Sequence, residues 1–201
     1  MVTSREKIID IASRLFIQKG YEGCTTIEIA KVAGLSNNSG LFKYFPSKEK
    51  MYRTIVDRYL VQQLHASKQK IGSYKRLSLQ KFIELYLKKI SEARIMLHSF
   101  INGGEKSSMY YLSFRLECGE RFEDCARAAV AFDEEEVNLW QDVIQRAIGS
   151  GEVKPDTNAY AVAKMFWYSY MGMSYMYSAK GGITDEDARG MLYDIYNMIK
   201  S

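Results

Sequence analysis

The stretch that decides the fold is residues 25–50, with the sequence TTIEIAKVAGLSNNSGLFKYFPSKEK. Thr25 followed three residues later by Glu28 is a capping-box pattern, which predicts that a helix begins here. The apolar side of this helix is expected to consist of Ile27, Ala30 and Val32. Gly34 can adopt the positive φ that a sharp turn after a helix requires. The stretch therefore predicts a short helix followed by a tight turn.

A second short helix is predicted directly after this turn. Its apolar residues, at helical spacing, are Leu41, Phe42 and Phe45. The residues expected to face outward are Asn37, Asn38, Ser39, Lys43 and Tyr44. A small residue in the first helix, a turn glycine and a polar-faced second helix are typical of a helix-turn-helix motif. The second helix of that motif enters the major groove of DNA.

The segment AGLSNNSGLFKYFPSKEKMY, residues 33–52, resembles the DNA-binding signature of the TetR family of transcriptional repressors. The resemblance covers about residues 5–60, and its most specific part is the run FPSKE that begins at Phe45. One residue more than in the common signature separates Gly34 from Leu41. We therefore expect a longer turn and a recognition helix that begins near Asn38. Which of residues 37–40 face the bases is left open.

The resemblance implies an all-α fold with two parts. Residues 1–47 are expected to form a three-helix, helix-turn-helix DNA-binding head, and residues 48–201 a larger helical body for effector binding and dimerisation. It also implies a ligand-responsive repressor that binds a palindromic operator in double-stranded DNA as a homodimer. The alternative is a ligand-binding or scaffolding helical protein that has kept a vestigial DNA-binding head.

The residues expected to contact DNA fall into two groups. The resemblance places Tyr44 and Lys48 where the family holds phosphates. Thr25 or Thr26, at the start of the first motif helix, is a further phosphate candidate, and Asn37 is a further DNA-binding candidate. Asn38, Ser39 and Lys43 are expected at base edges, because asparagine can pair with adenine and lysine can donate to guanine. Phe42 stands where the family often has tyrosine, and it is expected either to touch a thymine methyl group or to belong to the core.

The charge distribution agrees with a DNA-binding head. Residues 1–90 contain 17 Lys and Arg against 7 Asp and Glu, a net charge of +10. Residues 91–201 contain 11 against 17, a net charge of −6. A basic half that coincides with the helix-turn-helix is what a phosphate-binding surface needs. Ordinary scatter of surface charge is the alternative.

The remaining pattern is also helical. A first helix is expected from Thr3 to about Lys19, and a fourth from Ser47 to about Ile71 through Tyr59 and Leu64. Further helical segments are expected at residues 79–100, 107–130, 133–148, 156–179 and 184–199. The acidic run that follows Asp133 is expected in a first helical turn, where the helix dipole favours it.

The expected helix over residues 156–179 has no polar face. A helix that is apolar all round is buried on both sides, and the simplest second cover is another copy of the chain. The resemblance implies the same, since the last two long helices of the family pair with their symmetry mates. The residues expected in the dimer interface are Val162, Met165, Ser169, Gly172 and Met176.

The body is rich in aromatic residues, with 15 Tyr and 9 Phe in the whole chain. Aromatic side chains with polar tips suit a cavity for a small apolar or aromatic effector. The candidate ligand-binding residues are Phe82, Tyr86, Tyr110, Phe114, Trp140, Phe166, Trp167 and Tyr170. The alternative for each is ordinary core packing.

Little in the sequence indicates catalysis. His65 and His98 have no partner at the spacing of a metal site or a catalytic triad, so we expect no enzyme, no metal site and no cofactor. Three cysteines without metal-site spacing, Cys24, Cys118 and Cys125, are expected to be reduced core residues. No apolar run reaches the roughly 18 residues of a membrane span. Together these features predict a cytoplasmic protein without a membrane partner.

Overall fold

The computed structural model describes residues 4–58 and 77–201, and throughout these ranges the chain is built from helices joined by turns. The α-helices are α1 (Arg5–Gly23), α2 (Thr26–Val32), α3 (Asn38–Phe42), α4 (Lys48–Val56), α6 (Leu79–Ile101), α7 (Ser107–Arg121), α8 (Glu123–Gly149), α9 (Ala159–Tyr177) and α10 (Asp185–Ile199). Two short 3₁₀ turns, η3 (Gly104–Lys106) and η4 (Ser178–Lys180), complete them. The all-α prediction is confirmed.

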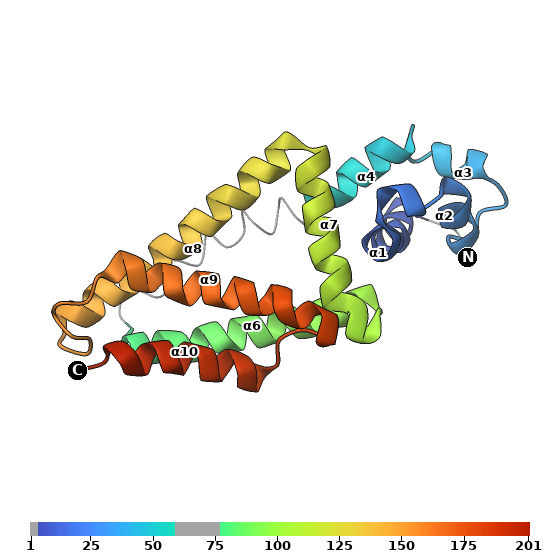
Figure 1. Cartoon of the computed structure of the whole chain (residues 1–201). Coiled ribbons are helices and arrows are strands. Elements are labelled where there is room, and N and C mark those ends of the chain that lie inside the picture. Colours follow the sequence, from blue (N-terminus) through green and yellow to red (C-terminus); the bar gives the residue numbers. More distant parts are fainter. Residues whose placement is uncertain (1–3, 59–76) are drawn as a thin grey trace.

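The molecule is elongated, with α1, α2 and α3 at one end and the carboxyl terminus at the other (Figure 1). Helix α7 stands between the two ends, next to α1 on one side and α8 on the other (Figure 1). Helices α6, α9 and α10 pack together in the body, and α8 packs along α9. The fold is therefore a small helical head joined to a larger helical body.

Side-chain caps explain where the head helices begin. The Ser4, Thr25, Asn37 and Ser47 side chains accept hydrogen bonds from backbone N–H groups in the first turns of α1, α2, α3 and α4. Each cap satisfies a donor that the helix itself leaves without a partner. The first helix was expected to open at Thr3, which lies outside the described residues, and its cap is Ser4.

The buried side of α2 differs from the expectation. Ile27 is 69% exposed and Val32 is 55% exposed, whereas Ile29 is fully buried and Ala30 nearly so. The cause is that only one side of this short helix faces α1 and α3, and Ile29 rather than its apolar neighbours points that way. The prediction for Ile27 and Val32 was wrong, and the prediction for Ala30 is confirmed.

Helix α4 packs into the same apolar cluster as the head and α7. Its buried residues, Met51, Tyr52, Ile55 and Val56, share this cluster with Phe16 of α1 and Phe114 of α7. The expected continuation of α4 through Tyr59 and Leu64 to about Ile71 lies outside the described residues. The division of the chain between residues 47 and 48 stays a prediction.

The stretch expected as one segment from 107 to 130 is divided at Phe122. Its backbone is extended, with φ −133° and ψ 110°, and it separates α7 from α8. Helix α8 therefore begins at Glu123, ten residues before the expected cap Asp133. The explanation of the acidic run by the helix dipole was wrong, because these residues lie in the middle of α8 and Glu136 is only 3% exposed.

The core of the body is centred on Trp140 of α8, which is fully buried. Its ring stacks on Phe166 of α9 with ring centres 4.3 Å apart and an angle of 7° between the planes. Phe82 and Tyr86 of α6 meet the same indole edge-on, at 4.8 and 4.9 Å. Three helices thus contribute aromatic rings to one packed cluster, and such pairs stabilise the fold beyond the area that they bury.

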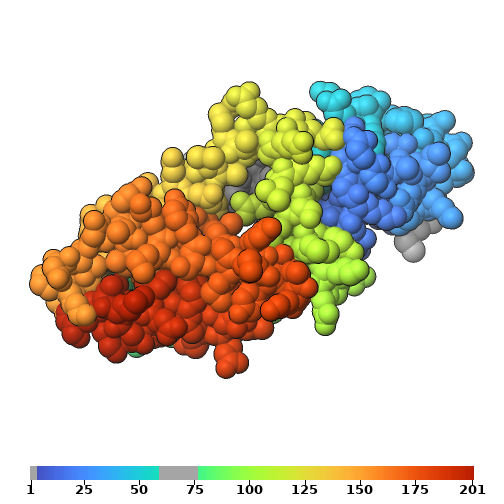
Figure 2. Space-filling model, in the orientation of Figure 1, coloured from blue at the N-terminus to red at the C-terminus, as the bar shows by residue number. Residues whose placement is uncertain are grey.

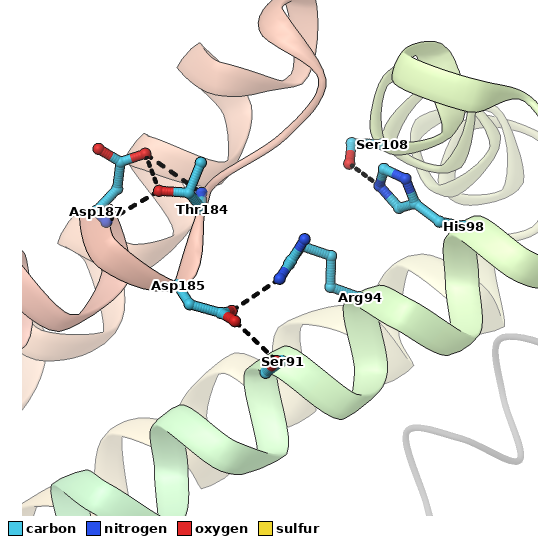
Figure 3. A network of polar contacts seen from close by, with 7 residues as sticks. All are labelled: Ser91, Arg94, His98, Ser108, Thr184, Asp185 and Asp187. Atoms are coloured by element: carbon cyan, nitrogen blue, oxygen red, sulfur yellow. Dashed lines mark hydrogen bonds and ion pairs between the residues drawn. The ribbon is translucent and has the colours of Figure 1, made fainter.

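The last two helices begin with asparagine and threonine caps. Helix α9 starts at Ala159 with Asn158 as its cap, later than the Pro155–Asp156 start that was expected. Helix α10 starts after Thr184. The Thr184 hydroxyl accepts from the Asp187 N–H and the Thr184 N–H donates to the Asp187 carboxylate, and these two bonds form a capping box. Next to that cap, Asp185 accepts hydrogen bonds from Arg94 (2.8 Å) and Ser91 (3.1 Å), which tie α10 to α6 (Figure 3).

In the described part of the chain, no helix is long and apolar enough to cross a membrane. Over the same residues, no group of three or more His, Cys, Asp and Glu side chains is arranged to hold a metal ion. Cys24, Cys118 and Cys125 are free and buried, as expected. Cys118 and Cys125 do not share a helix face, because the break at Phe122 places them on α7 and α8.

Candidate nucleic-acid interface and ligand-binding residues

The turn between α2 and α3 is built by Gly34, whose φ is +76°. The Leu35 N–H closes this turn by donating to the Ala30 carbonyl at 2.9 Å. Leu41 and Phe45, which are 1% and 2% exposed, hold α3 against the head core. Helix α3 begins at Asn38, so the prediction of a recognition helix that starts near this residue is confirmed.

Two polar side chains, one on α3 and one at its carboxyl-terminal cap, face solvent. Ser39 and Lys43 are both exposed, as expected for residues at base edges. Phe42 is 44% exposed, although it directly follows a buried leucine. The surface placement of Phe42 therefore decides against a core role and keeps its ring accessible.

The two asparagines before α3 make hydrogen bonds within the head. Asn37 Oδ1 accepts from the Gly40 N–H at 3.1 Å and thereby caps α3. Asn38 Nδ2 donates to Thr26 Oγ1 at 3.0 Å, which joins the start of α3 to α2. The Asn38 Oδ1 atom is buried and has no hydrogen bond within the described residues. Asn38 thus has a positioning role between the two motif helices.

The phosphate candidates lie at the amino-terminal ends of α2 and α4. Thr25 is exposed, and its hydroxyl oxygen accepts from the Glu28 N–H at 3.1 Å, which leaves its O–H able to donate elsewhere. Thr26 is half-buried and accepts from Asn38. Tyr44 is half-buried against the head core. Lys48 is the first residue of α4, where the helix end itself attracts anions.

Lys48 and Arg121 both contact the ring of Tyr21. The Lys48 Nζ atom lies 4.2 Å from the ring centre, and the Arg121 Cζ atom lies 4.0 Å from it. The backbone N–H of Tyr21 donates to Glu117 of α7 at 2.8 Å. Tyr21 therefore connects a predicted phosphate contact in α4 to α7 of the body.

A second connection joins α4 to the body directly. Arg53 makes two hydrogen bonds to Asp124 of α8, at 2.8 and 2.5 Å, and the Tyr52 hydroxyl donates to Glu117 at 3.0 Å. The Arg53 guanidinium lowers the pKa of Asp124 to about 2. Sequence reasoning missed this joint, because its partners are 65 and 71 residues apart and no local pattern links them.

The predicted ligand-binding residues do not form one site. Six of them lie in the body cluster: Phe82, Tyr86, Trp140, Phe166, Trp167 and Tyr170. The other two, Tyr110 and Phe114, belong to the cluster that the head shares with α4 and α7. Phe114 meets the Tyr52 ring edge-on at 6.0 Å, so it is part of the joint between head and body.

One carboxylate in the body core was not predicted as a site residue. Glu136 accepts hydrogen bonds from the Tyr86 hydroxyl at 2.6 Å and from Lys89 Nζ at 3.1 Å. Burial, and then the charge of Glu136, raise the pKa of Tyr86. These two hydrogen bonds satisfy the Glu136 carboxylate inside the protein. The sequence did not indicate this role, because Glu136 belongs to a run of acidic residues.

The predicted dimer-interface residues lie on different sides of α9. Val162 is 8% exposed and belongs to the core of its own chain, so its expected place in an interface is corrected. Met165, Gly172 and Met176 are exposed, and Ser169 is half-buried. Two tyrosines that were not predicted extend the exposed apolar stripe: Tyr168 (55% exposed) and Tyr175 (66% exposed).

Comparisons with known proteins separate into a match of the head and a likeness of the whole fold. Residues 8–55 match the family model described as bacterial regulatory proteins, tetR family. No curated protein matches the chain. Residues 8–55 contain α2, α3 and most of α1 and α4, so the match covers the helix-turn-helix and its supports.

Solved structures of similar shape cover nearly the whole chain. The structure of ketosteroid transcriptional regulator KstR2 of Mycobacterium tuberculosis is similar with a TM-score of 0.64 and 20% identity, over 100% of this chain and 97% of that one. NemR of E. coli, in its reduced form, is similar with a TM-score of 0.62 and 16% identity, over 97% and 96%. The regulatory protein TetR from Rhodobacter sphaeroides is similar with a TM-score of 0.62 and 16% identity, over 98% and 100%.

At these identities the likeness to solved structures shows the fold, and the family model adds the identity of the head. Members of this family are transcriptional regulators and not enzymes. The match of the head to the tetR family model, together with the fold of the whole chain, supports a TetR family transcriptional regulator.

Proposed function

We propose that this regulator is a ligand-responsive repressor that binds a palindromic operator as a homodimer and acts on DNA in the cytoplasm. The observation that carries the proposal is the division of α3 into two sides. Leu41 is buried in the head core, while Ser39 on the same short helix and Lys43 at its carboxyl-terminal cap are exposed. A helix that is held on one side and polar on the other is able to enter a major groove.

The contacts proposed for this surface follow its chemistry. Lys43 and Ser39 are assigned to base edges, and the exposed Phe42 ring to a thymine methyl group. Thr25, Thr26, Tyr44 and Lys48 are assigned to backbone phosphates. Asn37 and Asn38 act mainly by fixing the start of α3, since their amide groups bond within the head.

Dimerisation is proposed through the exposed stripe on α9. The stripe consists of exposed residues that follow one another at spacings of three and four: Met165, Tyr168, Gly172 and Tyr175. Met176, which is also exposed, lies beside this row. A row of exposed apolar residues on one helix face is costly in water and indicates a partner surface. Gly172 has no atom within 4 Å of an added Cβ position, which leaves room for a second helix to approach.

The ligand response is proposed to act through α4. Arg53 and Tyr52 attach α4 to Asp124 and Glu117 of the body. A rearrangement of α7 and α8 on ligand binding would therefore move α4 and change the separation of the two recognition helices. Because both half-sites must be engaged together for tight binding, a small change in this separation weakens repression.

The test of DNA binding is selection from random genomic fragments by the purified protein at several salt concentrations, followed by sequencing. Enrichment of a short palindrome is the expected result, and half-sites about one helical turn apart (roughly 34–36 Å) or a multiple of it fit a helix-turn-helix dimer. The matched control is the Lys43→Ala variant, which should lose the preferred sequence. Weak retention without a preferred sequence would instead favour a ligand-binding or scaffolding protein with a vestigial head.

The test of dimerisation is sedimentation equilibrium of the native protein and of the Met165→Glu variant. The native protein is expected to be a dimer, and the variant to dissociate, because a charge would be buried in an apolar interface. Met96→Glu is the matched control, since Met96 is 68% exposed on α6 and lies outside the stripe. A monomeric native protein, or equal dissociation of both variants, would remove the α9 stripe from the proposal.

A further inference from the structure

One carboxylate of α7 makes hydrogen bonds to two different helices of the head. Glu117 Oε1 accepts from the backbone N–H of Tyr21, near the end of α1, at 2.8 Å. Glu117 Oε2 accepts from the hydroxyl group of Tyr52, on α4, at 3.0 Å. The space-filling view shows the head in direct contact with α7 (Figure 2). Glu117 therefore joins α1, α4 and α7 at a single point.

A break in α1 presents the Tyr21 N–H to this carboxylate. Gly20 has φ +71° and ψ 174°, which are not helical values and which glycine adopts readily. In a continuous helix, the N–H of residue 21 would point along the axis toward the carbonyl of Ile17. An added Cβ at Gly20 would lie 3.5 Å from each carboxylate oxygen of Glu117. The carboxylate therefore lies directly against the break and binds the N–H that the break turns outward.

The second donor is held firmly in the core of the joint. Tyr52 is fully buried, and its ring meets the rings of Phe16 and Tyr21 edge-on, each with ring centres 4.9 Å apart. Burial raises the pKa of Tyr52, so its hydroxyl group stays protonated near neutral pH and can donate. A hydrogen bond to an ionised carboxylate is stronger than one between neutral groups. Both bonds of Glu117 are therefore made to groups whose positions are fixed.

Other hydrogen bonds of this joint attach one head helix each. Gln18 of α1 donates to the Ile101 carbonyl at 2.8 Å, and Arg53 of α4 donates to Asp124 of α8. Glu117 differs because it bonds to both head helices at once. Helix α3 packs in the same apolar cluster as α1 and α4. Fixing α1 and α4 against α7 therefore also fixes the recognition helix.

We propose that Glu117 is a positioning residue for DNA binding: it sets the angle between head and body, and thereby the half-site spacing that the dimer accepts. Helix α3 lies at the end of the molecule far from α7, so a small rotation at the joint is enlarged at the recognition helix (Figure 1). Two heads at a fixed angle fit one spacing, whereas two heads that rotate fit several. This role of Glu117 rests on the proposed homodimer on a palindromic operator.

Four variants of the full-length protein separate the two bonds. Glu117→Ala removes both of them, and Tyr52→Phe removes only the bond to α4. Glu117→Gln can keep both, because its amide oxygen accepts from the Tyr21 N–H while its amide N–H donates to the Tyr52 oxygen. Glu120→Ala is the matched control, since Glu120 is exposed on the same helix. Thermal unfolding establishes that each variant is folded.

The first measurement records the angle of the head without DNA. Spin labels are attached at Lys31→Cys of α2 and Lys88→Cys of α6, which are exposed positions, whereas the native cysteines are buried. Double electron–electron resonance gives the distribution of distances between the labels, and dilution with unlabelled protein restricts it to one protomer. The distribution should broaden in Glu117→Ala, broaden less in Tyr52→Phe, and stay as in the native protein in Glu117→Gln and Glu120→Ala.

The second measurement uses the palindrome recovered from genomic fragments. Synthetic duplexes carry it with none, one or two base pairs inserted at the centre, and each insertion turns one half-site by about 34–36° relative to the other. The native protein should bind the inserted duplexes more weakly. In Glu117→Ala the ratio of affinities for the uninserted and inserted duplexes should fall by about three- to tenfold. A general loss of stability would lower both affinities together and leave this ratio unchanged.

The outcomes decide the role of Glu117 in each case. An unchanged distance distribution or an unchanged spacing ratio in Glu117→Ala would overturn it. Equal effects of Tyr52→Phe and Glu117→Ala would show that the bond to α1 has no part in it. A Glu117→Gln variant that behaves like Glu117→Ala would show that hydrogen bonding is not the cause.

Two further outcomes keep the test decisive. If Glu117→Ala does not fold, Tyr52→Phe decides, and an unchanged distance distribution in that variant would overturn the role of Glu117. If the native protein selects no palindrome, the proposed regulator function fails, whereas the distance measurement, which uses no DNA, still decides whether Glu117 sets the angle of the head. The two failures are therefore distinguishable.

Discussion

The Nζ atom of Lys48 lies 4.2 Å from the centre of the Tyr21 ring, in a cation–π contact between the start of α4 and the end of α1. The same ring contacts Arg121 of α7, and the backbone of Tyr21 donates to Glu117. The position of a predicted phosphate contact therefore depends on packing between the head and the body. This relationship connects α7 of the body to the surface that is proposed to bind DNA.

Replacing Lys48 with alanine should lower the affinity for DNA of every sequence. The slope of log affinity against log salt concentration should fall by about one unit, because one phosphate contact is lost. Fluorescence anisotropy at several salt concentrations measures both quantities. Lys88→Ala is the matched control, since Lys88 is a 72% exposed lysine of the body. A slope unchanged in Lys48→Ala would remove Lys48 from the phosphate contacts.

Replacing Asp124 with asparagine should destabilise the joint between α4 and α8. Both partners are partly exposed, with side chains 31% and 47% accessible, so solvent screening limits the expected loss to about 0.5–1 kcal/mol. Urea unfolding at fixed protein concentration near neutral pH measures it. Asp142→Asn, exposed on the same helix, is the control and should change stability little.

The same ion pair should make this loss depend on pH. The pKa of Asp124 is lowered to about 2 in the folded protein by Arg53, below an unfolded value of about 3.9. Its stabilisation is therefore fully present above the unfolded pKa and lost as the pH falls toward the folded pKa. The difference between native protein and Asp124→Asn should shrink between about pH 4 and pH 2. A difference that stays constant over this range would contradict the assignment.

Replacing Gly182 with alanine should destabilise the junction of α7 and α10. Its φ is +99°, and an added Cβ would clash with Ser108 Oγ, which bonds to His98 (Figure 3). A strained backbone and a close contact together should cost roughly 1–3 kcal/mol. Thermal unfolding measures the loss as a lower midpoint.

Gly190→Ala is the matched glycine control for that experiment. Gly190 lies inside α10, and an added Cβ would meet no atom within 4 Å. Alanine should stabilise this helix by up to about 1 kcal/mol, because glycine is the poorer helix former. Opposite shifts of the two midpoints are expected, and equal shifts would show that packing at Gly182 is unimportant.

The three cysteines should react slowly with thiol reagents in the folded protein. Burial raises the pKa of Cys118 to about 12 and that of Cys24 to about 11, and it also raises that of Cys125. The thiolate is the reactive form, and very little of it is present near neutral pH. Mass spectrometry after brief alkylation should find unmodified protein, whereas the unfolded protein should carry three labels. Rapid labelling of the native protein would show that a cysteine is accessible.

Local signals in the sequence predicted several helix starts and turns correctly. Thr25, Ser47 and Thr184 cap helices as their positions indicate, and Gly34 and Gly181 have the positive φ that their turns need. These outcomes depend on a hydrogen bond or a steric limit within a few residues. The helix-turn-helix and its family resemblance are recognisable for the same reason, because the motif is contiguous.

Contacts between distant segments could not be predicted in this way. Arg53 meets Asp124 only because the corner between α7 and α8, at Phe122, lies against α4 (Figure 1). The acidic run of α8 had a plausible local explanation in the helix dipole, which was wrong once the helix began at Glu123.

The sequence by itself determined that the chain is helical, where most turns lie and which segment forms the DNA-binding motif. Only the tertiary structure decided that Ile27 is exposed, that Val162 packs inside its own chain, and that Arg53 of α4 pairs with Asp124 of α8. The physical reason is that caps, turns and helical periodicity act over one or two turns of chain. Burial and ion pairing depend instead on which helix lies opposite, and that is fixed by the packing of the whole molecule.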